Sequence, residues 1–302
     1  MIKAATGDTP ELRATLLLRL ARAAHSRRGV TAGLLVATAG VIAAIATSSE
    51  PPHTVPGPAP SSTAVPRTGL AEPVPAAAPA PPGLPVIDYR SAPRGLPADP
   101  APRSTATVAD GLHPTLPLIV YDAPGGKPLA FLPPSISGES VTVPIVSKRP
   151  GWVAVLLPSV NRRTGWLTTR GWSARSLRDH LVVRRRTHEL IWLRDGIRRA
   201  SWTVAVGAPA TPTPLGRTFV LGRTATSGSA YAGLDALALG SVPESRRTLP
   251  WGLRGGHTGI HSWYRSNAFG RSISNGCIRV PPAGLRVLLR NIAAGTTVTV
   301  ID

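Results

Sequence analysis

Hydrophobic and polar positions divide the chain into three stretches of different character. An uncharged apolar run, TAGLLVATAGVIAAIAT, extends from Thr31 to Thr47, and a stretch rich in proline and alanine follows from Glu50 to about Thr107. From Pro117 onward, short apolar runs alternate with turn signals, a pattern that predicts β-strands. We therefore expect a mainly β fold for the C-terminal part of the chain.

The apolar run predicts a membrane segment. About seventeen apolar residues is the lower limit for a transmembrane helix, and Arg27 and Arg28 lie directly before the run. A basic flank on that side keeps the N-terminus cytoplasmic and sends the rest of the chain out of the cell. We expect a cytoplasmic basic segment over 1–30 and a single-pass signal anchor over 31–49.

Two other interpretations of the same run stay open. Ala44-Ile45-Ala46 resembles a signal-peptidase site, and cleavage there would release the protein to the cell wall. The roughly thirty residues before the run form an unusually long basic region for a cleaved signal. A buried core helix is the third interpretation, and the basic flank argues against it.

The proline-rich stretch predicts a spacer. Sixteen of the 33 prolines fall between Pro51 and Pro102. Such a composition buries no core and favours an extended polyproline conformation. We predict a disordered linker over 50–115, which holds a folded head away from the membrane.

Short strand patterns over 116–175 predict a small β-barrel-like domain. LIVYDAPGGKPLAFL indicates two strands around a Gly125-Gly126 turn, and SVTVPIV and GWVAVLL indicate two more. YDAPGG and the dipeptides Gly151-Trp152 and Gly165-Trp166 resemble the Src-homology-type barrels found beside bacterial wall enzymes. We interpret the two tryptophans as core residues rather than as ligand platforms.

A second β-rich domain is predicted over 178–302. HLVVRRR and HELIWLR read as strands, and Asp195-Gly196 is a hairpin signal before the return strand IRRASWTVAVG. Pro281-Pro282 can start a helix, and TTVTVID closes the chain as a strand. That helix carries one apolar face, formed by Leu285, Leu288, Leu289 and Ile292.

The charge of the chain narrows the class of partner. Its formal net charge is +19, from 34 basic and 15 acidic residues. Such an excess favours contact with nucleic acid, acidic lipid or an anionic wall polymer. The expected export of the folded part argues against nucleic acid and leaves acidic lipid and anionic cell-wall polymers as the open alternatives.

The single cysteine, Cys277, is the main candidate for chemistry. An exported protein with one cysteine has no internal disulfide, so its thiol calls for another explanation. His261 lies sixteen positions upstream, and an imidazole can lower a thiol pKa and carry its proton. A buried, inert cysteine is the alternative. The glycines around His257 and His261 argue against a helical metal site, and we expect no metal.

Here the residues resemble a known family. The L,D-transpeptidases with a YkuD-type catalytic domain carry a histidine followed some 14–18 residues later by S/T-H-G-C-x-R/N. GIHS and SNGCIRV fit that pattern, and TPTPLG resembles the family's T-P-x-G turn. The resemblance covers roughly the C-terminal 40% of the chain. It implies a β-sandwich with one helix near the C-terminus.

The resemblance also implies roles for individual residues. Cys277 is the expected nucleophile, His261 its base, and the carbonyl of Ser262 the group that orients the imidazole. The backbone amides of Gly276 and Cys277 are the expected oxyanion hole, and Arg279 meets a substrate carboxylate or shapes the site.

Two positions depart from the family pattern. Asn275 stands where the family usually has histidine, and Ser262-Trp263 stands where it often has Gly-Thr. We expect Asn275 to affect thiol tuning and Trp263 to affect the substrate groove. Both are counted with Ser274 and Arg279 as candidate substrate-binding residues.

The function implied is cysteine-dependent L,D-transpeptidation, which forms 3→3 cross-links between peptidoglycan stem peptides without a cofactor. Carbapenem-type β-lactams are the expected covalent inhibitors. The alternatives are a non-catalytic wall-binding protein that keeps the fold and, less favoured, a sortase-like transpeptidase. Sortases separate His from Cys by far more residues, and papain-like wall peptidases reverse the order of the two.

Overall fold

The computed structural model describes residues 73–88, 93–243, 247, 249 and 256–302. The chain divides into two compact units, 1–67 and 68–302, and the described residues all belong to the second. The predicted cytoplasmic segment and signal anchor lie outside the described residues. Within the described ranges, no helix is long and apolar enough to cross a membrane.

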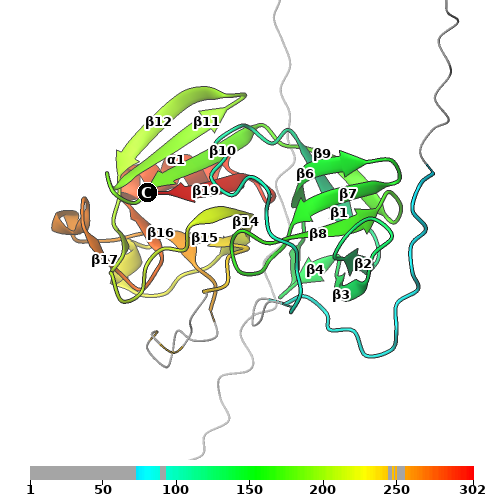
Figure 1. The fold of residues 1–302 in the computed structure, drawn as a ribbon. Coiled ribbons are helices and arrows are strands. Elements are labelled where there is room, and N and C mark those ends of the chain that lie inside the picture. The colour runs from blue at the N-terminus through cyan, green and yellow to red at the C-terminus, as the bar shows by residue number, and fades with distance from the viewer. Residues whose placement is uncertain (1–72, 89–92, 244–246, 248, 250–255) are drawn as a thin grey trace, which may run out of the picture. The chain divides into compact units, whose positions relative to one another are not determined.

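The first folded element is a seven-stranded antiparallel sheet with the order β3-β2-β8-β7-β6-β1-β9 (Figure 1). The strands predicted around Gly125-Gly126 are β2 and β3, and the sheet begins at Asp110, before the predicted boundary. Its members are β1 (Asp110–Pro114), β2 (Leu118–Tyr121), β3 (Pro128–Leu132), β6 (Val143–Arg149), β7 (Trp152–Leu156), β8 (Thr164–Thr168) and β9 (Trp172–Ser176), and a short hairpin of β4 (Ser135–Ile136) and β5 (Glu139–Ser140) lies beside it.

The strand pairing leaves β3 and β9 as the two edges of this sheet. The predicted barrel-like domain is thus an open sheet in its strand pairing. The β3 edge is covered by a different segment. The Ile87 amide donates to the Phe131 carbonyl at 2.8 Å, and the Phe131 amide donates to the Pro85 carbonyl at 2.9 Å. The backbone of Phe131, at the edge of the sheet, is therefore satisfied by residues from the proline-rich stretch.

The prediction of a disordered linker over 50–115 is wrong for its C-terminal part. Residues 73–88 and 93–109 take defined positions against the sheet, with Ile87 and Leu96 buried in its core. The few large apolar side chains between the prolines supply the burial that orders this stretch. The composition of the stretch does not reveal these apolar side chains, because prolines and alanines dominate its average hydrophobicity.

An ion pair ties this stretch to the second domain. Arg217 donates from Nε to Asp99 Oδ2 at 2.7 Å and from Nη2 to Oδ1 at 2.5 Å. The Asp99 side chain is fully buried and that of Arg217 is 6% exposed. Because a buried charge without its partner is strongly destabilising, each residue depends on the other.

The second domain is built on an eight-stranded mixed sheet with the order β12-β11-β10-β19-β14-β15-β16-β18 (Figure 1). The pairs β10–β19 and β16–β18 are parallel. Phe219 and Leu221 of β14 belong to the core of the first sheet, so the two domains share buried contacts. The strands are β10 (Asp179–Arg184), β11 (Glu189–Arg194), β12 (Ile197–Thr203), β14 (Gly216–Thr224), β15 (Ala236–Leu239), β16 (Gly259–Ser262), β18 (Ile278–Val280) and β19 (Thr297–Ile301).

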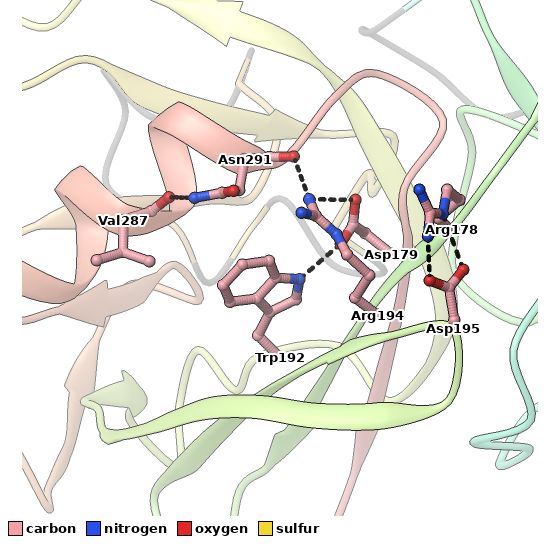
Figure 2. A network of polar contacts seen from close by, with 7 residues as sticks. All are labelled: Arg178, Asp179, Trp192, Arg194, Asp195, Val287 and Asn291. Atoms are coloured by element: carbon pink, nitrogen blue, oxygen red, sulfur yellow. Dashed lines mark hydrogen bonds and ion pairs between the residues drawn. The ribbon is translucent and has the colours of Figure 1, made fainter. Parts of the chain in front are cut away.

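The predicted helix is confirmed as α1 (Pro282–Asn291), with proline in its first turn. Leu285 and Leu288 are fully buried against the sheet. Figure 2 shows how the end of α1 is fixed: Arg194 donates to Asp179 and to the Asn291 carbonyl, and the Trp192 indole donates to the same Asp179 carboxylate. This network joins α1 to β10 and β11.

His180 on β10 makes the fold sensitive to acid. Its side chain is fully buried, and its Nε2 lies 2.9 Å from Thr299 Oγ1. Burial lowers the pKa of His180 to about 4, and the nearby Arg217 charge acts in the same direction. The folded protein therefore keeps this imidazole neutral well below its ordinary pKa of about 6.5.

We expect His180 to reduce stability as the pH falls. Between about pH 6.5 and 4, His180 is protonated in the unfolded chain and neutral in the folded chain. The free energy of unfolding therefore drops by about 3 kcal/mol over this range. Urea unfolding at neutral pH and near pH 4 measures this loss. His180→Gln should show a smaller loss than the wild type; an equal loss in both proteins would contradict the assignment.

Candidate active site

Parallel pairing of β16 with β18 brings the predicted cysteine and histidine together. The register sets Ile260 opposite Ile278 and His261 opposite Arg279. One step back in this register, Cys277 lies beside Gly259, and the Gly259 backbone forms a hydrogen bond with the thiol. Because side chains alternate along a strand, Cys277 and His261 emerge on the same face.

His261 is fixed in one tautomer. Its Nδ1 lies 2.7 Å from the Ser262 carbonyl oxygen, which can only accept. Nδ1 therefore carries the proton, and Nε2 is the basic nitrogen of the ring. The Tyr231 ring contacts the imidazole edge-to-face, with centroids 5.1 Å apart. The side chain of His261 is buried, so this orientation is held on several sides.

Cys277 and His261 open into the same cavity, which has a volume of about 640 Å³. Its lining includes residues of β14, β15 and β16, the loop 225–227, and the short β4–β5 hairpin beside the first sheet, through Ile136, Ser137 and Glu139. Both domains therefore contribute walls to the space in front of the thiol.

Burial sets the protonation of the pair. It raises the pKa of the Cys277 thiol, against the lowering effects of the Gly259 hydrogen bond and the Arg279 charge. It also lowers the pKa of His261, which the Ser262 hydrogen bond raises and Arg279 lowers further. Both dominant shifts favour the uncharged forms, so the resting pair is a thiol beside a neutral imidazole.

The turn before the thiol is held by its own serine. The Ser274 hydroxyl donates to the Cys277 carbonyl at 2.5 Å and accepts from the Gly276 amide at 3.2 Å. Gly276 has φ near +106°, a conformation that favours glycine. Ser274, predicted to bind substrate, is buried and occupied in this turn, and the Gly276 amide, predicted to serve the oxyanion hole, is directed to the same hydroxyl.

The TPTPLG turn supports this loop from behind. The Thr211 hydroxyl and the Ala208 amide both donate to the Ser274 carbonyl, at 3.0 and 2.9 Å. Gly207, in the short strand β13 (Val206–Gly207), lies so close to the turn that an added Cβ would come within 2.3 Å of the Thr211 carbonyl. The TPTPLG motif, predicted to be a turn, therefore stabilises the loop that carries Cys277.

Arg279 and Trp263 form a stacked pair beside the histidine. The guanidinium carbon lies 3.7 Å from the centroid of the Trp263 ring, and the two ring centroids of His261 and Trp263 are 6.2 Å apart. Desolvation lowers the pKa of Arg279. The cation–π contact fixes the direction of the guanidinium. Neither residue lines the cavity of Cys277.

Asn275 faces elsewhere. It is exposed and lines a second cavity of about 300 Å³, together with Thr211, Pro212 and Gly276. None of the four residues predicted to bind substrate therefore lines the cavity of Cys277. Sequence reasoning missed Tyr231, which lines the cavity and contacts His261, because its short helical turn, Ser229–Tyr231, carries no motif.

No group of three or more His, Cys, Asp or Glu side chains suited to a metal ion occurs among the residues that the structure describes. The site that the described residues form contains one thiol, one oriented imidazole and the backbone amides of the cysteine turn. This set suits acyl transfer through a covalent thioester.

One comparison with known proteins agrees with the motif. Residues 178–300 match the family model of the YkuD L,D-transpeptidase catalytic domain. A search of curated proteins found no match.

Solved structures similar to this chain include three L,D-transpeptidases. One is L,D-transpeptidase 3 from Mycobacterium tuberculosis with a faropenem-derived adduct, at 17% identity and a TM-score of 0.34, which covers 47% of this chain and 74% of that one. Another is from Mycobacterium smegmatis, at 14% identity and 0.37, covering 68% and 97%. The third is the catalytic domain from E. faecium, at 22% identity and 0.30, covering 41% and 96%.

The neutral resting pair predicts slow alkylation of Cys277 at neutral pH. Because Cys277 is the only thiol of the chain, iodoacetamide uptake followed by mass spectrometry reports it alone. We expect its rate to rise with an apparent pKa above that of the peptide Ser274–Arg279, and Arg279→Ala to raise the pKa further because a lowering charge is lost. An apparent pKa well below that of the peptide would indicate a preformed thiolate–imidazolium pair instead.

Proposed function

We propose that this chain, whose residues 178–300 belong to the YkuD L,D-transpeptidase catalytic-domain family, is a cysteine-dependent L,D-transpeptidase of peptidoglycan. The observation that carries the proposal is the placement of Cys277 and His261 on one face of two paired parallel strands, opening into one cavity. The Ser262 carbonyl gives His261 the tautomer that a general base needs.

In the proposed first half-reaction, Cys277 Sγ attacks the carbonyl at the L-centre of the diamino acid in a donor stem peptide. His261 Nε2 accepts the thiol proton as the carbon–sulfur bond forms. The tetrahedral intermediate then breaks its bond to the terminal D-alanine, whose amine leaves with the proton carried by His261. A thioester on Cys277 and free D-alanine are the products.

In the second half-reaction, the side-chain amine of a neighbouring stem attacks the thioester carbonyl. His261 accepts a proton from the amine and returns it to the departing sulfur. One amide bond forms for the amide bond that was broken, so the 3→3 cross-link requires no external energy source. The neutral resting pair suits this cycle, because the proton moves only when an acyl group is present.

The developing oxyanion needs backbone donors. The amide of Cys277 is the donor we assign first, since the Gly276 amide bonds to Ser274 Oγ. Arg279, whose direction is fixed on Trp263, is the group we assign to a substrate carboxylate near the site. Water in place of the acceptor amine would give a carboxypeptidase with the same first half-reaction.

The cellular setting is part of the proposal. We infer that the uncharged run within 31–49 anchors the protein in the membrane, with the folded unit outside. The formal charge of +19 supports contact with anionic wall polymers. A released form in the wall would follow if the N-terminal segment is cleaved.

The test is covalent labelling by a carbapenem, because a strained β-lactam carbonyl acylates the same nucleophile as the donor stem. We expect the full chain to gain a single drug-sized mass, and Cys277→Ala to gain none. His261→Gln should slow acylation by at least a hundredfold, through loss of the general base.

A non-catalytic wall-binding protein with this fold is the alternative. A folded wild-type chain that gains no adduct, while still sedimenting with isolated cell walls, would support that alternative and overturn the proposal. Circular dichroism of both proteins provides the control for folding.

A further inference from the structure

Two aromatic residues of the first sheet hold the proline-rich stretch through its carbonyl groups. The Trp152 indole donates from Nε1 to the Pro75 carbonyl at 3.0 Å, and the Tyr121 hydroxyl donates to the Ala78 carbonyl at 2.7 Å. The two rings contact each other edge-to-face, with centroids 5.0 Å apart. Trp152, predicted to be a core residue, is 1% exposed, and Tyr121 is 2% exposed. These two buried side chains form one aromatic face that contacts two points of the segment.

The spacing of the two acceptors fits a polyproline helix. Pro75 and Ala78 are three residues apart, and a polyproline II helix has three residues per turn and no internal hydrogen bonds. Its carbonyls at i and i+3 thus point the same way and are free to accept. The segment from Pro73 to Pro82 reads PVPAAAPAPP, a composition that favours this conformation before any contact is made.

Glycines open the path of the segment over the sheet. An added Cβ at Gly151 would come within 2.4 Å of Val74 Cγ1, and one at Gly125 within 2.7 Å of Pro75 Cβ. Both glycines also have positive φ, near +73° and +68°. The turns that carry them, between β6 and β7 and between β2 and β3, leave just enough room for the segment.

The segment itself is not part of a hydrophobic core. Val74 is 56% exposed, and Pro73, Pro75, Ala76 and Ala77 are exposed as well. By contrast, Ile87 further along the chain is fully buried, and its amide donates to the Phe131 carbonyl of β3. The contact with Tyr121 and Trp152 therefore has the character of a bound peptide, held by donors to its backbone and by apolar contact on an aromatic face.

We infer that the face formed by Tyr121 and Trp152 is a binding site for proline-rich extended peptides, and that residues 73–82 of the same chain occupy it in cis. The site recognises two backbone carbonyls that lie one polyproline turn apart. Beside the turns that carry Gly125 and Gly151 it accepts a small side chain or a proline. It lies outside the lining of the Cys277 cavity, so the inference is independent of the proposed catalytic function. Occupation in cis fixes where the proline-rich stretch joins the folded unit.

The main experiment empties the site within the full chain. Residues 73–82 are replaced by a Gly/Ser sequence of equal length, and a fluorescein-labelled peptide PVPAAAPAPP is titrated in solution while its anisotropy is followed. We expect the replaced chain to bind the peptide with saturation. The wild-type chain should need at least tenfold more peptide, because its own segment competes at a high effective concentration. A Gly/Ser peptide of equal length serves as the ligand control.

Tyr121→Phe in the replaced chain tests the hydroxyl donor specifically. Loss of one hydrogen bond should weaken peptide binding about fivefold. Tyr264→Phe removes a hydroxyl from an exposed tyrosine that does not touch the segment and should leave binding unchanged. Equal effects of the two variants would overturn the assignment of the site.

A second readout does not depend on the replacement. Elastase cleaves after small residues such as Ala76 and Ala77, so docking should protect the wild-type chain, and Tyr121→Phe should raise cleavage there at least threefold. Equal cleavage in both, or no saturable peptide binding by the replaced chain, overturns the inference.

Sedimentation of the wild-type chain tests whether the segment binds in cis. We expect a monomer. A dimer that the replacement dissociates would show that a second copy supplies the segment, and would overturn occupation in cis.

Discussion

The parallel pairing of β16 with β18 is the constraint on which the site depends. Two segments that are sixteen residues apart in sequence are forced into a fixed register, and the register leaves no choice of face for Cys277 and His261. A slip of one residue would turn one of the two side chains away from the cavity. Two neighbouring elements hold this pair of strands. The strand β15 pairs with β16, and the helix α1 follows β18 directly.

The second level of the site is a set of restraints on groups that would otherwise move. A carbonyl fixes the histidine, an aromatic ring packs on it, a serine ties the cysteine turn, and the TPTPLG turn holds that serine. Burial makes charge separation within the pair costly at rest. Such a site is pre-organised in geometry rather than in charge.

Local patterns predicted the elements well where sequence and structure are coupled over short distances. The strands around Gly125-Gly126, the hairpin at Asp195-Gly196 and the helix after Pro281 each follow from a turn residue and a few apolar positions. The link between His261 and Cys277 was predicted from their sixteen-residue spacing and from a family motif, and not from periodicity. Tyr231 and the orientations of Asn275 and Ser274 depend on tertiary contacts that no local pattern encodes.

The prediction of disorder for the proline-rich stretch was the largest error, because average composition does not show which few residues find partners elsewhere in the fold. Its average composition lacks the apolar area for a core of its own, but Ile87 and Leu96 pack in the core of the first sheet, and Asp99 pairs with Arg217 of the second domain. A segment can thus be ordered by another domain's surface while remaining unable to fold alone.

Product analysis with a defined stem peptide separates a transpeptidase from a binding protein. The full chain is incubated with a tetrapeptide stem that ends in D-alanine, and products are followed by mass spectrometry beside Cys277→Ala. We expect free D-alanine together with a dimer joined between the diamino acids of two stems, both absent with the variant. Release of D-alanine by the Cys277→Ala chain, or intact stem peptide after incubation with a folded wild type that also forms no thioester, would contradict it.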